Sequence, residues 1–329
     1  MSGVAGDTKV LVTGGSGFIG TNLVQYYLDR GAEVVNIDIR PPRNPDHEHV
    51  WFKQDILERK ALSELLCGFS PDYVFHMAAR TDLNGKTVGD YAANTIGVSN
   101  LVEIANELPG IQRVIYASSM LVCRLGYRPE SYRDYCPPNA YGDSKVLGER
   151  IVREQSRDGV PWVIVRPTSI WGPWFDVPYK RFFSAIQKGL YFHPKGKTIR
   201  RSYGFVLNTV HQLDRIARID INNLVSRTLY VADYEPINLR EWGEMIRIAM
   251  DARRIREIPV PVLRGAALFG DLLSFLGNLD PPLTSRRLGN LLTNAIFDLT
   301  DLAQACPELP YGTQEGVAMT VEWMQETGT

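Results

Sequence analysis

The stretch Thr13-Gly14-Gly15-Ser16-Gly17-Phe18-Ile19-Gly20 decides the fold, because it joins a β-branched run, Val10–Thr13, to the start of a helical pattern. Gly14, Gly17 and Gly20 have the spacing of a turn that brings the backbone close to a pyrophosphate and the helix close to the sheet. The N-terminus of that helix adds amide donors and a positive dipole. The stretch therefore predicts a dinucleotide-binding strand–loop–helix, with Phe18 and Ile19 included in the cofactor site.

Outward from this loop, short β-branched runs alternate with helical stretches, which is typical of a doubly wound parallel sheet. The predicted strands are Val10–Thr13, Glu33–Ile37, Val50–Lys53, Tyr73–His76, Arg113–Ala117 and Trp162–Arg166. The predicted helices between them are Phe18–Arg30, Arg59–Leu66, Val88–Glu107 and Ala140–Gln155. Two further strand-like runs, Gly204–Leu207 and Thr228–Ala232, are candidates to return to the sheet. We expect an α/β Rossmann fold with a smaller, mostly helical C-terminal lobe.

The pattern after Pro167 predicts that this second lobe is built from two stretches of chain. A passage rich in Trp, Pro and Gly begins at Trp171, and mostly helical segments broken by prolines follow Asn238. We expect residues 1–170 plus about 204–233 to form the dinucleotide-binding domain, and about 171–203 plus 234–329 to form the substrate lobe. The apolar stretch Val262–Leu279 is interrupted by Arg264 and Asp271, so it predicts a packed or surface-associated helix and no membrane span.

The composition and charge of the chain indicate which kinds of partner, compartment and metal site to expect. The 329 residues are 44% hydrophobic and 22% charged, with a net charge of −1 and no Lys/Arg-rich run, so we expect no nucleic-acid partner. The four cysteines lack the spacing of a zinc site, and we expect a cytoplasmic protein. His47 and His49 fall in a proline-bounded loop, where a solvated turn is favoured over a metal site, and no metal is predicted.

Asp38 sets the expected cofactor preference. It lies 18 residues past Gly20, at the end of the second predicted strand, where a carboxylate can accept both hydroxyls of the adenosine ribose. This favours NAD over NADP, because Asp38 would repel a ribose 2′-phosphate. Arg40 and Arg43 are close enough in sequence to keep NADP as an alternative.

The stretch Tyr141-Gly142-Asp143-Ser144-Lys145 contains a candidate catalytic set. Its spacing puts the phenol of Tyr141 and the ammonium of Lys145 on one face of a predicted helix. A free tyrosine titrates near 10, so its use as a base at neutral pH needs positive charge nearby. Lys145 supplies that charge and can also hold the nicotinamide ribose. Ser119 follows the strand Arg113–Ala117, so its hydroxyl is placed at the sheet edge where ligands bind and can orient the substrate.

In the order and spacing of its motifs the chain resembles the extended short-chain dehydrogenase/reductase family, especially its nucleotide-sugar epimerases and dehydratases. By that resemblance Asp55 and Ile56 meet the adenine, Ala78 and Ala79 meet the cofactor backbone, and Asn94 joins the active-site hydrogen-bond network. The motifs are Thr13–Gly20, Asp55-Ile56, His76-Met77-Ala78-Ala79, Tyr91–Asn100, Ala117-Ser118-Ser119, Tyr141–Lys145, Arg166-Pro167 and Trp171-Gly172-Pro173.

The resemblance also implies substrate contacts in the second lobe. Relatives clamp the substrate diphosphate with two arginines, matched here by Arg201 and by Arg287, with Arg286 as the alternative. Ser169 stands in the substrate site, where many sugar epimerases of the family have an asparagine. The family also suggests a homodimer formed through the helices Val88–Glu107 and Ala140–Gln155.

The two residues after Ser119 distinguish between the reactions that members of the resembled family catalyse. Dehydratases of the family carry an Asp-Glu pair there and decarboxylases a glutamate, whereas this chain has Met120 and Leu121, which cannot transfer protons. We expect a nucleotide-sugar epimerase, similar to UDP-sugar 4-epimerases, that oxidises and re-reduces its substrate on bound NAD. The alternatives are a net NAD(P)-dependent oxidoreductase, similar to the hydroxysteroid-dehydrogenase-like branch, and a non-catalytic dinucleotide sensor.

Overall fold

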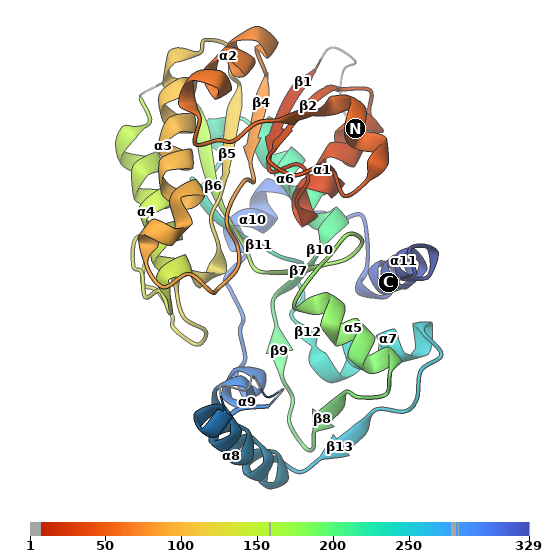
Figure 1. The fold of residues 1–329 in the computed structure, drawn as a ribbon. Helices are drawn as coiled ribbons and strands as arrows, with labels where there is room; N and C mark the ends of the chain where they lie inside the picture. Colours follow the sequence, from red (N-terminus) through yellow and green to blue (C-terminus); the bar gives the residue numbers. More distant parts are fainter. Residues whose placement is uncertain (1–7, 158, 278–280, 282, 329) are drawn as a thin grey trace. The chain divides into compact units, whose positions relative to one another are not determined.

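The computed structural model describes residues 8–157, 159–277, 281 and 283–328 (Figure 1). These residues form two compact units. Unit 1 comprises the described residues of Met1–Phe175, Gly204–Tyr234 and Asp298–Tyr311, and unit 2 those of Asp176–Tyr203, Glu235–Phe297 and Gly312–Thr329. The end of the expected apolar stretch, residues 278 and 279, lies outside the described residues, as do residues 1–7 and 329 of the expected domains.

Unit 1 is built on a seven-stranded parallel sheet with the strand order β11-β6-β5-β4-β1-β2-β3. The order reverses beside β1, which puts the carboxyl ends of β1 and β4 at a topological switch point, the usual ligand site of such sheets. The Rossmann fold class predicted from the sequence is confirmed. The strands are β1 (Lys9–Thr13), β2 (Glu33–Asp38), β3 (Trp51–Lys53), β4 (Tyr73–His76), β5 (Arg113–Ala117), β6 (Trp162–Pro167) and β11 (Thr228–Val231).

Helices cover both faces of this sheet (Figure 1). On one face α1 (Phe18–Leu28), α6 (Val206–Arg218) and the short α10 (Thr300–Ala305) enclose a core of β-branched and aromatic side chains. On the other face α2 (Arg59–Phe69), α3 (Ala92–Glu107) and α4 (Ala140–Gln155) enclose a second apolar core. Because both faces are covered, the central strands are buried along most of their length.

Three local expectations differ from the structure. The run Gly204–Leu207 does not join the main sheet, because β10 (Tyr203–Phe205) pairs with β7 (Ser169–Trp171) and α6 begins at Val206. The expected helix Val88–Glu107 begins with a 3₁₀ turn, η2 (Val88–Tyr91), capped by Thr87 and Asp90. A 3₁₀ turn, η1 (Pro45–Val50), replaces the expected solvated loop. His47 is buried there, with Nε2 2.8 Å from Oε1 of Gln25.

Unit 2 contains mostly helices around an aromatic core. Phe182 stacks on Trp242 with 4.9 Å between ring centroids and 11° between ring planes, and Phe183 and Tyr203 meet the same indole edge-on. Two small sheets pair β9 with β12 and β8 with β13. The elements are α5 (Tyr179–Gln187), β8 (Phe192–Pro194), β9 (Arg200–Arg201), β12 (Ile237–Asn238), α7 (Leu239–Ala249), β13 (Arg256–Ile258), α8 (Val260–Gly277), α9 (Ser285–Leu292) and α11 (Thr313–Glu326).

Within the part of the chain that the structure describes, no helix combines the length and the hydropathy that crossing a membrane requires.

Candidate active site

The glycine loop after β1 has the shape of a cradle for a dinucleotide. Gly14 has φ +73, and a Cβ added to it would lie 2.5 Å from the backbone nitrogen of Ala78. A Cβ on Gly20 would lie 2.1 Å from the carbonyl oxygen of Gly14, so both close approaches require glycine. The first turn of α1 has no acidic residue and no capping side chain, which leaves its amides available to an anion. The loop fits the pyrophosphate of a nicotinamide dinucleotide.

Asp38 ends β2 beside this loop. Its carboxylate accepts hydrogen bonds from the backbone nitrogens of Ser16, at 3.2 Å, and Arg40, at 3.0 Å, so the side chain is held in place although it is buried. Arg40 is exposed, whereas Arg43 donates to the carbonyl oxygen of Trp174 at 2.9 Å. The structure thus ties the predicted ribose ligand to the phosphate loop, and it ties one of the two candidate 2′-phosphate ligands to another part of unit 1.

The three predicted catalytic residues come together at the carboxyl end of β5. Tyr141 and Lys145 lie one turn apart near the start of α4, a helix capped by the side chain of Asn139. The Lys145 ammonium donates to the carbonyl oxygen of Ala117 at 2.9 Å, and Tyr141 is hydrogen-bonded to the hydroxyl of Ser119. The end of β5 therefore holds both the predicted base and the predicted ammonium partner, and all three residues are at least nine-tenths buried.

Burial sets the electrostatics of this group. It raises the pKa of Tyr141 above its ordinary value, although the hydrogen bond with Ser119 acts in the opposite direction. Burial also lowers the pKa of Lys145 to about 8, against the attraction of Glu149. Burial and the nearby Lys145 charge lower the pKa of His76 to about 3, so His76 is neutral near pH 7. Lys145 lies one helical turn after Tyr141 and bonds the carbonyl oxygen of Ala117, and positive charge from a bound cofactor would favour the phenolate of Tyr141.

A buried ion-pair network lies behind the catalytic residues. Glu149, one turn after Lys145 on α4, accepts hydrogen bonds from Ser118, Tyr135, Arg153 and Arg166. Burial raises the pKa of Glu149, but the bidentate hydrogen bonds and charge of Arg166 outweigh burial and hold that pKa below its usual value. Sequence reasoning assigned Glu149 no role. Its position four residues after Lys145, on the helix face that also carries Tyr141, was the available signal.

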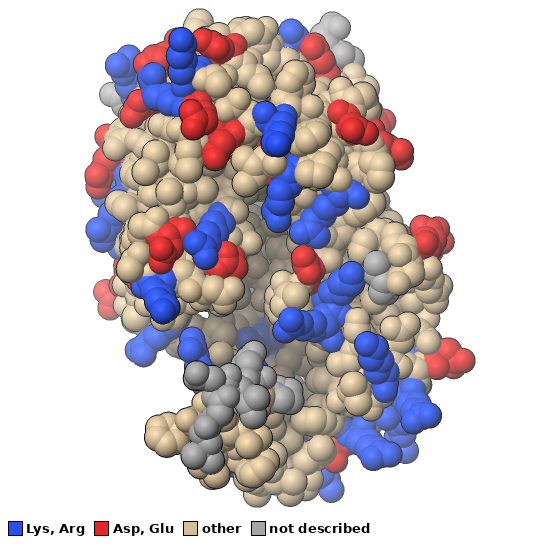
Figure 2. All heavy atoms as spheres, in the orientation of Figure 1, with Lys and Arg blue, Asp and Glu red and all other residues tan. Residues whose placement is uncertain are grey.

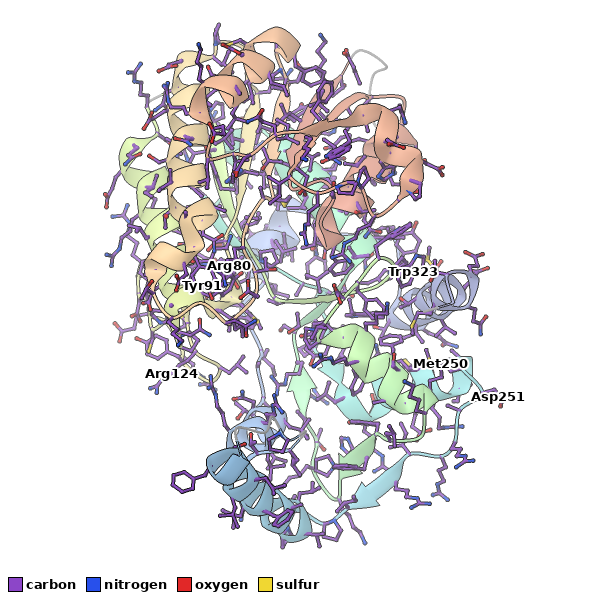
Figure 3. All side chains as sticks on the ribbon, viewed as in Figure 1. Arg80, Tyr91, Arg124, Met250, Asp251 and Trp323 are labelled. Carbon is purple, nitrogen blue, oxygen red and sulfur yellow. The ribbon has the colours of Figure 1, made fainter. Side chains whose placement is uncertain are left out.

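Tyr91 was also missed as a supporting residue. Its ring meets the Tyr141 ring edge-on, with 5.8 Å between centroids, and the Arg80 guanidinium lies 5.1 Å from the Tyr91 ring centroid. Figure 3 shows Arg80 and Tyr91 close together near the start of α3. The Tyr91 hydroxyl donates to the carbonyl oxygen of Asp82 at 2.9 Å. The loop after β4 thus packs against the phenol of Tyr141, the predicted base.

Residues predicted for the rest of the cofactor line the same sheet edge. Ala78 and Ala79 follow β4, and the Ala78 amide donates to the hydroxyl of Thr13 at 3.4 Å. Asn94 is fully buried, and it bonds both backbone groups of Arg80 and the hydroxyl of Ser144. Asn94 therefore connects the loop after β4 to the helix that carries Tyr141. Asp55 and buried Ile56 follow β3 at the same edge, and the Asp55 carboxylate accepts from the amide of Leu57.

The predicted substrate residues belong to different units. Ser169 is buried in β7 of unit 1. In unit 2, Arg201 donates to the backbone carbonyls of Asn290 and Leu291, and exposed Arg287 donates to that of Pro281. The structure thus holds both guanidinium groups near α9, and their predicted contact with a diphosphate stays a prediction.

The acid–base groups beside the cradle are few. Met120 and Leu121 form the 3₁₀ turn η3 (Met120–Val122), whose first amides are capped by Ser119, and neither side chain can carry a proton. Among the residues that the structure describes, no three His, Cys, Asp or Glu side chains gather as a metal site would require. The set of Ser119, Tyr141 and Lys145 can move a proton to and from a hydroxyl while an adjacent cofactor exchanges a hydride.

Comparisons with known proteins agree with this geometry. Residues 10–216 match the model of the NAD dependent epimerase/dehydratase family. The chain is 31% identical over 265 residues to a 3 beta-hydroxysteroid dehydrogenase/Delta 5-->4-isomerase of Mycobacterium tuberculosis, covering 74% of this chain and 70% of the relative. It is 24% identical to N-acetyl-alpha-D-glucosaminyl-diphospho-ditrans,octacis-undecaprenol 4-epimerase of Escherichia coli O157:H7, covering 96% and 95%.

Among solved structures, the fold is similar to that of the UDP-glucose 4-epimerase of Thermotoga maritima in complex with UDP-glucose. The TM-score is 0.73 at 19% identity, and the alignment covers 98% of this chain and 100% of the other. This similarity supports the fold, while the family model matches well over half of the chain and includes the glycine loop and the Tyr141–Lys145 motif. The chain belongs to the NAD-dependent epimerase/dehydratase family, whose members are extended short-chain dehydrogenases/reductases.

Proposed function

We propose that this protein is a nucleotide-sugar epimerase, similar to UDP-sugar 4-epimerases, that oxidises a sugar hydroxyl and then reduces the ketone from the other face. The observation that carries the proposal is the composition of the site. Ser119, Tyr141 and Lys145 meet at the end of β5, and the two residues after Ser119 are Met120 and Leu121. Such a site supports reversible oxidation and lacks the extra proton donors that dehydration or decarboxylation uses in this family.

In this proposal each residue has one task. Ser119 donates to the substrate oxygen and orients it toward Tyr141. Tyr141 takes the hydroxyl proton when the sugar is oxidised and returns it when the ketone is reduced, while the Lys145 charge stabilises the phenolate. Bound NAD supplies the hydride acceptor, the returning hydride and the positive ring that lowers the pKa of Tyr141. The Gly14–Gly20 loop and Asp38 hold the dinucleotide, with NAD preferred to NADP because Asp38 faces the ribose.

Substrate recognition in this proposal uses the second unit. Arg201 and Arg287 bind the diphosphate of the nucleotide sugar, which suits permanently charged, planar guanidinium groups. Ser169 contacts the sugar. The solved neighbours support this substrate class, since their names include UDP-glucose, UDP-glucuronic acid and UDP as bound molecules.

A second candidate is net oxidation or reduction of a hydroxyl or ketone by NAD(P). It is favoured by one observation, the 31% identity to mycobacterial 3 beta-hydroxysteroid dehydrogenase/isomerase, which exceeds the 24% identity to the 4-epimerase of Escherichia coli O157:H7. The same three catalytic residues serve both reactions, because the first half-reaction of an epimerase is an oxidation.

The two candidates differ in whether reduced cofactor accumulates. The purified protein is incubated with NAD and a panel of nucleotide sugars, and separately with hydroxysteroids, and both epimer and NADH are measured. The proposal expects an epimer to form at a rate far above that of NADH release. Stoichiometric NADH on a steroid, with no sugar converted, would replace the first candidate by the second.

A further inference from the structure

Helix α8 of unit 2 has apolar side chains on both of its faces. One face is buried, because Leu263 and Ala267 pack with Leu288 of α9 into a small cluster. On the opposite face large apolar side chains are exposed, and Phe275 reaches 87% exposure. A helix with apolar side chains on all of its faces is normally buried in protein or lipid. We therefore expect the exposed face of α8 to bind an apolar partner.

The exposed face is continuous along the helix. At 100° per residue, positions three and four apart share a face, and the apolar residues of this face follow that spacing. Arg264 and Asp271 lie together at one edge of it, and Asp271 accepts a hydrogen bond from the amide of Ser285 at 3.1 Å, at the start of α9. The middle of the face therefore presents no charge. We name this surface the α8 face and define it by Val262, Gly265, Ala266, Leu268, Phe269, Leu272 and Phe275.

Basic residues predominate in the segments that neighbour α8 in unit 2. Residues 188–200 and 253–292 contain ten Lys and Arg but only three Asp and Glu. Two of these carboxylates are already engaged, since Asp271 accepts from Ser285 and Glu257 pairs with Arg240 at 2.6 Å. In the lower part of Figure 2 the surface at α8 is mostly free of charge, and Lys and Arg predominate beside it near β13. This excess is local, because the whole chain has a net charge of −1.

Several of these basic residues are held near α8 by its neighbours. Lys195 follows β8, and its amide donates to the carbonyl oxygen of Ile258 at 2.8 Å, two residues before α8 begins. Arg256 lies in β13 directly before the helix, and Arg286 is exposed on α9, which packs against it. Exposed apolar side chains on a helix, with cations on it and on the elements beside it, are typical of helices that lie in the headgroup region of an anionic membrane.

We propose that the α8 face docks on the surface of an anionic lipid bilayer, with Phe269 and Phe275 inserted among the acyl chains and the surrounding Lys and Arg on lipid phosphates. Lipid suits the face better than a second copy of the chain does, because a copy would bring its own excess of cations close to these. The face also has no polar group in its middle that could fix the register of a protein partner. This docking is independent of the proposed sugar chemistry, and the test below does not use activity.

Flotation with vesicles tests the docking directly. The full-length protein is mixed with vesicles of neutral phosphatidylcholine alone, or with about one third anionic phosphatidylglycerol, and the bound fraction is measured. Binding to the anionic vesicles is expected. The double variant Phe269→Gln/Phe275→Gln should bind about a hundred-fold more weakly, at about ten-fold for each partly inserted ring. Arg264→Glu should weaken binding to anionic vesicles several-fold and leave binding to neutral ones nearly unchanged.

The matched control is Ile248→Gln, which removes an exposed apolar side chain on α7, 66% exposed and outside the α8 face. It should bind anionic vesicles as the unmodified protein does. Circular dichroism of each variant shows whether it remains folded, and light scattering shows which oligomer it forms. Equal vesicle binding by the Phe269/Phe275 variant and the unmodified protein would overturn the proposal. So would a dimer without vesicle affinity that the same variant converts to monomer, which would assign the face to a second copy.

Discussion

Units 1 and 2 differ in where they keep their charged side chains. Unit 1 buries charge at its centre, where Glu149 is paired with Arg166 and hydrogen-bonded on all sides behind Lys145. Unit 2 has an aromatic core around Trp242, and most of its arginines are exposed. A buried, satisfied network fixes atoms for chemistry, whereas exposed cations are accessible to an anion from outside. The difference suggests that unit 1 holds the reacting groups and unit 2 selects the partners.

The largest effect is expected from removing the hydroxyl group of Tyr141 in unit 1. Tyr141→Phe removes the hydroxyl that takes and returns the proton, and we expect turnover to fall by about a thousand-fold, within the usual range for general acid–base groups. Dinucleotide affinity should stay nearly unchanged, because the ring remains packed against Tyr91. Steady-state turnover and cofactor titration measure the two quantities. Turnover equal to that of the unmodified protein would remove Tyr141 from the mechanism.

Glu149→Gln tests whether the buried network is essential to unit 1. The variant keeps the shape of the side chain but leaves Arg166 without its carboxylate partner, so the free energy of unfolding should fall by about 3–5 kcal/mol. Glu154→Gln is the matched control, since Glu154 lies on the same helix but is exposed, and it should change stability by less than about 0.5 kcal/mol. Denaturant unfolding of both variants gives the answer, and equal stabilities would show that the network contributes little.

Asp38→Ala tests the cofactor end of the site. The carboxylate is held by the amides of Ser16 and Arg40, and loss of its hydrogen bonds to the ribose should weaken NAD binding about ten- to hundred-fold. Affinity for NADP should change less or rise, because a repulsive charge is gone. Titration of both dinucleotides, with Asp46→Ala on the exposed side of η1 as the control, measures the ratio. An unchanged ratio would contradict the assigned role of Asp38.

At neutral pH the smallest expected effect is that of the buried histidine, whose contribution to stability appears only in acid. His76 has its pKa lowered to about 3 in the folded protein, while an unfolded histidine titrates near 6.5. The unfolded chain therefore binds the extra proton as pH falls below about 6.5, and stability is lost by at most about 1.4 kcal/mol per pH unit toward pH 3. His76→Asn should flatten this acid slope between pH 6.5 and 4, measured by thermal unfolding.

Subtracting the acid slope of the His76→Asn variant from that of the unmodified protein isolates the contribution of His76. Other buried groups, such as Asp233 whose pKa burial raises to about 7, titrate in both proteins and cancel from the difference. The exposed His49 provides the control variant His49→Asn, which should keep the acid slope. A slope that survives in His76→Asn would show that His76 is not what destabilises the fold in acid.

The sequence predicted unit 1 well because its elements are local and its motifs are short. The glycine loop, the strands and the Tyr141–Lys145 turn depend on neighbouring residues, so their pattern could be read without tertiary information. The strand Thr228–Ala232 was correctly expected to return to the sheet, whereas the run Gly204–Leu207 is divided between β10, which pairs with β7, and the start of α6. Its partner β7 is only three residues long, too short to show an alternating pattern.

Contacts between distant segments were the part that sequence reasoning could not supply. Glu149 contacts partners on β6, α4 and the loop after β5, and apart from Arg153, four residues later on the same helix, no spacing along the chain indicates that they meet. The contact made by Tyr91 was missed for the same reason, because it depends on the packing of the loop after β4 against α4. The exposure of the α8 face also follows from tertiary packing. The stretch was recognised as a packed or surface helix, but which of its faces is buried depends on α9.

The central claim is that the hydride removed by the site returns to the same substrate molecule. It is tested most directly with a nucleotide sugar deuterated at the carbon to be inverted, incubated with the purified protein and unlabelled NAD. Product analysis by mass spectrometry should find an epimer that retains the deuterium, with no matching amount of free NADH, and Tyr141→Phe should form almost none. Loss of the deuterium to free cofactor, with a ketone as the final product, would contradict the epimerase account.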